Sequence, residues 1–457
     1  MSVERVLPKT LDYTDVLPLA VESKSRRRTF FPNNGQQFVS NAANIIRIDL
    51  SADALLDTQH SYLRFTYSQG AGQTCGFDYA GGHAFIRRLR IEQSGTVLED
   101  IQSYNRLMGA VVLPCQSTVE HKRTRTLLEG IRQDGGAAGA LAAAPIGIVA
   151  GNVPAADGVQ GNSNNPNNQI AAAPAGVYDF CIPLTSGLMN CDKLVPLMLM
   201  SAPLTIEIEL ANETQAVVQS GGPVPYTISN VRYIANLVEV GQDVSQQLRM
   251  LQEVSGGVLT LAGQTYRHFG GVLPGGATNN IINVPARVKS MKSLFFASQG
   301  AGADANTTYD VGTGGHMNLI NYQLKIGSVV YPPTPVAAGA QIGINTAAEM
   351  FMELEKAWGN TGSRFGLGSE TKISTLYAVE SARAVQNGRY TFAPFGLDLE
   401  AFQKVAIESG VNTADRSLPI SLITNHAAGA AATNIDVYVL ADALFYINQD
   451  GSMSVSV

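Results

Sequence analysis

Histidine and cysteine most often carry catalysis or hold metals in proteins, and both are scattered singly along this chain. No histidine has a second histidine at the two- to four-residue spacing typical of a metal site; the six are His60, His83, His121, His268, His316 and His426. The four cysteines also lack CxxC spacing; they are Cys75, Cys115, Cys181 and Cys191. We expect these to be structural thiols in a reducing compartment. The sequence predicts neither a metal site nor a cofactor.

Two residue pairs could in principle do acid–base or nucleophilic chemistry. Cys75 and His83 are eight residues apart and could act as nucleophile and base, but we interpret them as chance neighbours in a glycine-rich turn region. Asp398 and Glu400 would share one face of a strand, and we interpret them as an acidic pair in a loop or at a helix start. The chain also lacks the P-loop, dinucleotide-binding, HExxH and GxSxG motifs. We therefore predict a structural or binding protein, with no catalytic residues.

Composition and charge narrow the class of protein further. The chain has 457 residues, enough for two domains. Only 15% of them are charged, below the usual quarter or so, which suggests that much of the surface is buried against other copies. The net charge of −6 disfavours polyanion binding. Two basic clusters, at 24–28 and 121–125, are better explained as solvated or ion-paired side chains, so we predict no specific nucleic-acid site.

Neither a secretory signal nor a membrane span is expected. The first 17 residues contain charges and a proline where a signal peptide needs an apolar core. The most apolar segments, 140–151 and 194–200, are too short to cross a bilayer. We expect a soluble protein made in the cytoplasm.

Alternating apolar residues predict many short strands. The segment 202–211 contains LTIEIEL, in which every second residue is apolar, as in a half-buried strand. The segment 98–112 changes to helical spacing, and 345–359 is predicted as a helical insert that Trp358 packs. Residues 243–256 have apolar side chains at helical spacing and predict a linker helix. A polar arm is expected over 1–30, and a long loop over 134–176, where Gly, Ala, Asn and Pro dominate.

One hairpin pattern occurs twice, half a chain apart. In 87–100 Leu89 and Ile91 alternate with arginines before a Ser-Gly turn, and 321–335 repeats this arrangement before Pro332 and Pro333. We expect those prolines to end the strand and direct the chain outward. The repeat predicts an all-β fold of two consecutive eight-stranded jelly-roll β-sandwiches with short helical inserts. The expected domains are the first jelly roll at 31–242, the linker at 243–256 and the second jelly roll at 257–457.

Several stretches, in this order, resemble the double jelly-roll major capsid proteins of icosahedral DNA viruses. These are LDTQHSYLRFTY (56–67), FIRRLRIEQSGTVLEDIQSYNRL (85–107), the Pro-Leu segment and long strand at 182–211, YQLKIGSVVYPPTP (322–335) and GRYTFAPFGLDLEAF (388–402). The resemblance covers roughly 38–457. It is most specific to Polinton-like, virophage-like and adintovirus-like members of the lineage that includes adenovirus hexon.

This resemblance implies a shell-building protein of the virion, made in the host cytoplasm. Three chains would form a pseudo-hexameric homotrimeric capsomer that contacts neighbouring capsomers, penton proteins and minor capsid proteins. The arm would face an internal membrane or the genome. The alternative is a β-sandwich spike that binds a receptor or a glycan, although one tryptophan gives little sign of a sugar platform. A cupin-type enzyme would need a histidine cluster that the sequence lacks.

Overall fold

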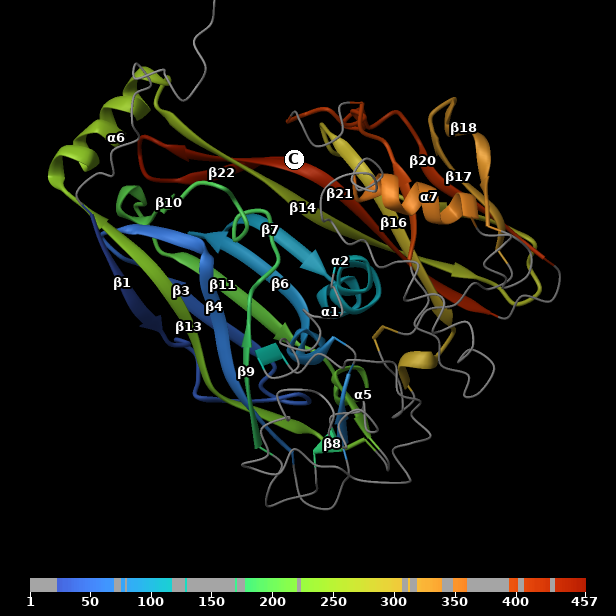
Figure 1. The fold of residues 1–457 in the computed structure, drawn as a ribbon, viewed down its shortest axis with the longest axis horizontal. Coiled ribbons are helices and arrows are strands. Elements are labelled where there is room, and N and C mark those ends of the chain that lie inside the picture. The colour runs from blue at the N-terminus through green and yellow to red at the C-terminus, as the bar shows by residue number, and fades with distance from the viewer. Residues whose placement is uncertain are drawn as a thin grey trace, which may run out of the picture.

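Two β-sandwiches follow one another along the chain, and helix α6 (Gln242–Val254) lies between them in sequence (Figure 1). The computed structural model describes residues 23–69, 75–78, 80–116, 128–129, 169–170, 177–219, 223–305, 311–312, 319–338, 348–359, 394–401, 407–427 and 432–457. Apart from 169–170, the long loop predicted at 134–176 lies outside these residues, as do the arm residues 1–22. None of the helices in the described segments is long and apolar enough to span a bilayer.

The first sandwich packs two antiparallel sheets against each other. One sheet has the order β1 (Ser23–Phe30), β13 (Tyr226–Val240), β4 (Leu55–Gln69), β10 (Val195–Pro196), with β2 (Gln37–Val39) added on β13 and β9 (Val177–Ile182) on β4. The other has the order β3 (Ile45–Leu50), β11 (Leu204–Leu210), β6 (Ile86–Gln93), β7 (Thr96–Gln102). A small third sheet contains β12 (Val217–Gln219), β5 (Cys75–Phe77) and β8 (Gln169–Ile170).

The second sandwich has the same plan. One sheet has the order β14 (Val258–Leu273), β21 (Thr433–Asn448), β16 (Met291–Gly300), β19 (Phe395–Asp398), with β22 (Met453–Ser456) on β21. The facing sheet has the order β15 (Asn279–Asn283), β20 (Ile420–His426), β17 (Leu319–Ile326), β18 (Val329–Ala337). The helical inserts are α1 (Tyr104–Arg106), a π-helical turn η3 (Leu107–Val112), α2 (Leu113–Gln116), α5 (Glu213–Ala216) and α7 (Ala348–Ala357), with short 3-10 turns at Gly81–Phe85 (η2), Leu197–Leu199 (η5) and Ala303–Ala305 (η6).

Eight strands of one sandwich correspond, in chain order and in sheet position, to eight strands of the other. The corresponding pairs are β1 and β14, β3 and β15, β4 and β16, β6 and β17, β7 and β18, β9 and β19, β11 and β20, and β13 and β21. In both sandwiches helical turns follow the same strand of the eight. α1, η3 and α2 follow β7, and α7 follows β18. The predicted fold of two consecutive eight-stranded jelly rolls is therefore confirmed.

Aromatic pairs at corresponding places fill the two cores. In the first sandwich Phe65 of β4 lies opposite Phe180 of β9, with ring centroids 5.2 Å apart. In the second, Phe296 of β16 lies opposite Phe395 of β19, with ring centroids 4.6 Å apart. All four side chains are buried. Cross-strand aromatic pairs of this kind are a main source of sheet stability.

The repeated hairpin patterns form β6–β7 and β17–β18, each at the edge of its four-stranded sheet. The first turn needs positive φ at Ser94 and Gly95 and the second needs it at Gly327, which is why small turn residues interrupt the alternation. The expectation that Pro332 and Pro333 end the second strand is wrong, because β18 continues to Ala337. An edge strand leaves one row of backbone groups unpaired, so prolines without N–H groups are tolerated there.

The last eight residues of the arm predicted over 1–30 form a strand. Ser23–Phe30 form β1, which pairs along its full length with β13, from Ser23 opposite Val240 to Phe30 opposite Tyr233. Assigning these eight residues to the arm was therefore wrong. Six of the eight are exposed on the sheet edge, so the segment lacks the apolar alternation that identifies a half-buried strand.

Candidate functional site: the junction between the two sandwiches

The residues considered for catalysis form no catalytic arrangement within the described part of the chain. The backbone of Cys75 lies in β5, but its side chain lies outside the described residues. His83 is buried, with its Nε2 3.3 Å from Glu129 and its Nδ1 3.4 Å from the hydroxyl of Tyr104. Asp398 ends β19 and accepts a hydrogen bond from the backbone N–H of Glu400, which follows the strand.

The remaining histidines and cysteines are dispersed as the sequence indicates. His60 contacts Asp57, His268 contacts Asp436 and His426 contacts Thr424, whereas His121 and His316 lie outside the described residues. Over the described ranges no group of three His, Cys, Asp or Glu side chains could hold a metal ion. Three thiols are free: Cys115, Cys181 and Cys191. Burial raises the pKa of Cys115 to about 12, so this thiol is held in its unreactive protonated form.

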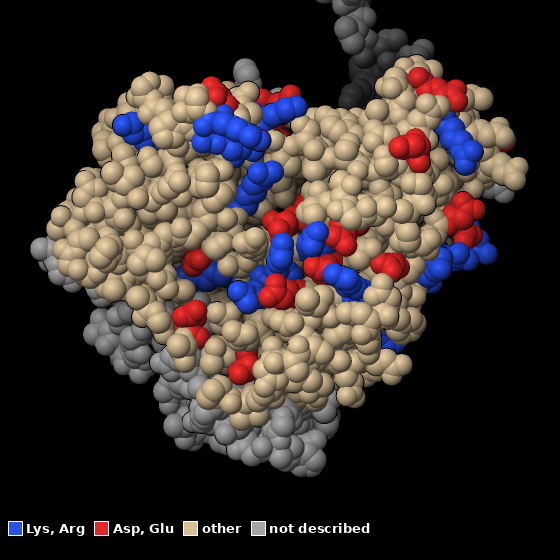
Figure 2. All heavy atoms as spheres, turned by 180° about the vertical axis from the view of Figure 1, so that it is seen from behind, with Lys and Arg blue, Asp and Glu red and all other residues tan. Residues whose placement is uncertain are grey.

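The charged side chains are mostly partnered on the molecule itself. Arg26 forms a 2.9 Å ion pair with Glu239 of the neighbouring strand, and Arg28 lies over the ring of Phe30. The second basic cluster, 121–125, lies outside the described residues. Figure 2 shows basic and acidic side chains interleaved in the middle of one face, while uncharged residues cover most of the rest. Arginines paired in this way leave little excess positive charge on this face.

Buried polar contacts join the two sandwiches where they meet. Strands β14 and β21 extend from the end near α6 to the far end of the second sandwich, and β14 contacts β7 of the first (Figure 1). Three clusters of contacts hold this junction. They centre on Glu99, on Arg106 with Asp436, and on Gln93.

Glu99 of β7 connects the two sandwiches through its carboxylate. Its two oxygens accept hydrogen bonds from the backbone N–H groups of Gly187 and Leu188, at 2.8 and 2.9 Å, and its side chain also contacts Thr265 of β14. Glu99 is buried, and desolvation raises its pKa above the ordinary value although these hydrogen bonds oppose the shift. A carboxylate fixed in this way holds the loop around Gly187 against the second sandwich.

The second contact is an ion pair between the sandwiches. Arg106, at the end of α1, places Nε 3.2 Å from Oδ2 of Asp436 in β21, and its Nη1 donates to the backbone oxygen of Val311 at 2.6 Å. Asp436 also contacts Nε2 of His268 at 2.9 Å. Burial alone would raise the pKa of Asp436, but the His268 hydrogen bond and the Arg106 charge outweigh it and lower this pKa.

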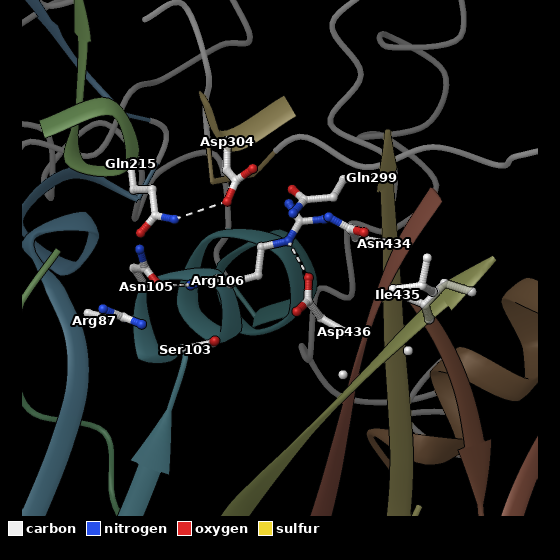
Figure 3. Close-up of a pocket in the computed structure, with 13 residues that line it drawn as sticks. Arg87, Ser103, Asn105, Arg106, Gln215, Gln299, Asp304, Asn434, Ile435 and Asp436 are labelled. Atoms are coloured by element: carbon white, nitrogen blue, oxygen red, sulfur yellow. Dashed lines mark hydrogen bonds and ion pairs between the residues drawn. The ribbon is translucent and has the colours of Figure 1, made fainter. Parts of the chain in front are cut away.

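Arg106 and Asp436 line a cavity of about 300 Å³ between the sandwiches. Figure 3 shows Arg106 directed from the helical turns of the first sandwich toward Asp436 on the strands of the second, and Gln215 directed toward Asp304. Across this cavity Arg106 pairs with Asp436 and Gln215 donates to Asp304, so polar contacts on its walls join the two sandwiches.

The third contact joins the last hairpin to the first sandwich. Gln93, at the end of β6, donates from Nε2 to the backbone oxygen of Gly451 at 3.1 Å and accepts from the N–H of Met453 at 2.6 Å. Gln93 is 358 and 360 residues from these partners. The sequence predicts none of these three clusters, because a glutamate within a strand, an arginine in a helical turn and a glutamine at a strand end carry no local signal of a distant partner.

No family model matches the sequence, and no curated protein matches it either. Solved structures do match it over nearly the whole chain. PBCV-1 VP54, fitted into a reconstruction of the virophage Sputnik, is 10% identical, with 97% of this chain and 99% of that chain covered and a TM-score of 0.58. The Faustovirus major capsid protein is 9% identical, with 96% and 92% covered and a TM-score of 0.56.

A chain of the Sputnik virophage structure is 11% identical, with 100% of this chain and 93% of that chain covered and a TM-score of 0.56. At such low identity a likeness establishes the fold. The chain has the fold of the Faustovirus major capsid protein and of these viral chains, the double jelly roll that the sequence predicts.

Proposed function

We propose that this chain is a major capsid protein that builds an icosahedral virion shell. The observation that carries the proposal is the strand-by-strand correspondence of two sandwiches held in one orientation by buried contacts. Because one chain supplies two similar blocks, three chains supply six, which is the requirement for a pseudo-hexameric capsomer. The similarity to the Faustovirus major capsid protein over 96% of the chain supports the same function.

The rigidity of the junction matters for this function. Capsomers can tile a shell only if the two sandwiches of each chain keep a constant angle. A deviation in that angle would be repeated in every chain of the lattice. Interfaces between domains of one chain often permit relative motion. Here ion pairs and backbone hydrogen bonds to Glu99, Arg106 and Gln93 oppose it.

The proposed partners are copies of the chain itself, first within a homotrimer and then between neighbouring capsomers, with penton and minor capsid proteins completing the shell. The proposed units are the first jelly roll to residue 242, the linker 243–256 and the second jelly roll 257–457. Residues 1–22 precede β1, and we assign them to contact with an internal membrane or the genome. The segment 134–176 is assigned to the outer face or to a trimer contact.

Size-exclusion chromatography with light scattering, followed by negative-stain imaging, tests this proposal. We expect a particle of about three times 48.4 kDa with a hexagonal outline. A stable monomer that binds a glycan or a receptor would overturn the proposal in favour of a spike protein. The trimer should persist without 134–176, while removal of 1–22 should preserve the trimer but prevent shell assembly.

A further inference from the structure

A lysine is buried between two carboxylates in the second sandwich, away from the junction contacts. Lys292 lies in β16, where the pairing with β21 shifts between Met291 and Ser293, so it is the extra residue of a β-bulge. Its ammonium group lies 2.9 Å from Oε1 of Glu400 and 3.2 Å from Oδ1 of Asp442. All three side chains are about one-twentieth exposed.

The three residues come from adjacent strands. Asp442 lies in β21, on one side of β16, and Glu400 follows β19, on the other side. Backbone hydrogen bonds hold both acidic residues close to Lys292. The N–H of Asp442 donates to the oxygen of Ser290, and the N–H of Leu399, next to Glu400, donates to the oxygen of Lys292. The lysine therefore has one carboxylate on each flank and little access to water.

The two oxygens of Asp442 have different surroundings. Oδ1 faces the lysine, whereas Oδ2 accepts hydrogen bonds from the hydroxyl of Ser290 and from the N–H of Glu408, both at 2.8 Å. Two fixed donors on the oxygen that faces away from an amine are the arrangement that stabilises negative charge when a nucleophile attacks a carboxyl carbon. Glu400 in turn accepts a hydrogen bond from the hydroxyl of Ser409, which orients it toward the lysine.

We propose that Lys292 and Asp442 condense to an amide bond that cross-links β16 to β21. The geometry places the lysine Nζ beside the Asp442 carboxyl, and a lysine amine that has given up its proton is a nucleophile. Glu400 takes a proton from the ammonium group and passes it to Oδ1 of Asp442, and the neutral lysine Nζ then attacks Cγ of the protonated carboxyl. Negative charge develops on Oδ2, between its two donors.

The remaining steps balance the reaction. Oδ1 already carries the first proton; Glu400 transfers a second proton to it from the attacking nitrogen, Oδ1 leaves as water, and Oδ2 becomes the amide oxygen. One N–C bond forms and one C–O bond breaks, and no oxidant, reductant or cofactor is required. The product replaces a buried ammonium and a buried carboxylate by a neutral amide, so the desolvation cost of that ion pair is removed.

Intact-mass spectrometry of the full, denatured chain tests this cross-link. The expected mass is lower than the sequence mass by one water molecule. Trypsin should then cut after Lys289 and Lys325 but leave Lys292 uncut, so that peptide 290–325 is recovered joined to peptide 417–457. A chain with its full sequence mass, and with separate peptides, would show that the three residues form an ion cluster only and would overturn the proposal.

Two variants separate the chemistry from a merely structural role. Glu400→Gln removes the proton acceptor at nearly constant size and should leave the chain at full mass. Asp442→Asn should still cross-link but lose ammonia in place of water. If Asp442→Asn loses water instead, the water comes from another site, such as cyclisation at Asp450 next to Gly451, and the proposal fails.

Lys356 and Glu353 supply an internal control. They form a 3.0 Å pair on α7 much like the Lys292 pair, but Lys356 is 39% exposed. We expect trypsin to cut after Lys356 in every sample. Resistance at both lysines would mean that cleavage reports accessibility and not amide formation, and would remove the support that the peptide map gives.

Discussion

A Cβ atom added to Gly263 of β14 would lie 2.2 Å from the backbone oxygen of Gly187. The two glycines come from different sandwiches, and this is where their backbones approach closely. No side chain fits between them, because contacts under 3.0 Å force the backbone to move. The junction is therefore set by backbone contact as well as by the buried polar groups beside it.

Gly263→Ala should destabilise the chain by about 1–3 kcal/mol, the usual cost of overpacking a close contact. The free energy of unfolding from urea titration measures this. The matched control is Gly270→Ala in the same strand, where an added Cβ meets nothing within 4 Å. Equal stability of the two variants would contradict the close contact.

Asp436→Asn should destabilise the chain by about 3–5 kcal/mol, because it leaves the buried charge of Arg106 without its carboxylate. Asp100→Asn is the control, since Asp100 pairs with Arg88 at 2.6 Å but both side chains are about one-third exposed. That pair should contribute less than about 1 kcal/mol. Comparable losses in the two variants would argue against a buried ion pair at the junction.

The Asp436 carboxylate should also make the junction sensitive to acid. Its pKa is lowered in the folded chain below the ordinary 3.8, so its contribution to stability is present above 3.8 and is lost as pH falls through the lower, folded value. Thermal melts from neutral pH to below pH 3.8 should show a steep loss in this range for the natural chain. The Asp436→Asn variant should have a flatter profile there, and parallel profiles would refute the assignment.

Gln323 should support the proline-containing edge strand. Its Nε2 donates to the backbone oxygens of Pro332 and Pro333, at 2.7 and 3.2 Å. Gln323→Ala should cost about 1 kcal/mol, the usual net contribution of such a contact. Lys325→Ala on the same strand is exposed and should change the thermal midpoint little; a larger effect at Lys325 would count against the contact.

Local patterning predicted much of the fold. The alternation in LTIEIEL became β11, and the helical spacing over 243–256 became α6 at Gln242–Val254. Trp358 packs the helical insert, as expected, and its ring centroid lies 4.5 Å from that of Phe295 in β16. In each case the signal is a period in the side chains themselves, so neighbours in sequence suffice to reveal it.

Edge strands gave weaker signals. β1 was missed because its side chains are mostly exposed, and β18 was expected to stop at prolines that an edge can hold. An edge strand buries little and pairs on one side only, so neither alternation nor hydrogen-bonding capacity identifies it from sequence.

Two similar sandwiches, their hairpins and the helix between them follow from local sequence patterns, because these depend on residues a few positions apart. Which distant residues meet depends on how the folded chain packs. Arg106 reaches Asp436 across 330 positions, and Lys292 reaches Asp442 across 150 positions. A polar side chain is the same letter in the sequence whether it is hydrated at the surface or bonded to a buried partner. The interaction energy of the buried pair depends on the dry, close-packed surroundings that folding creates.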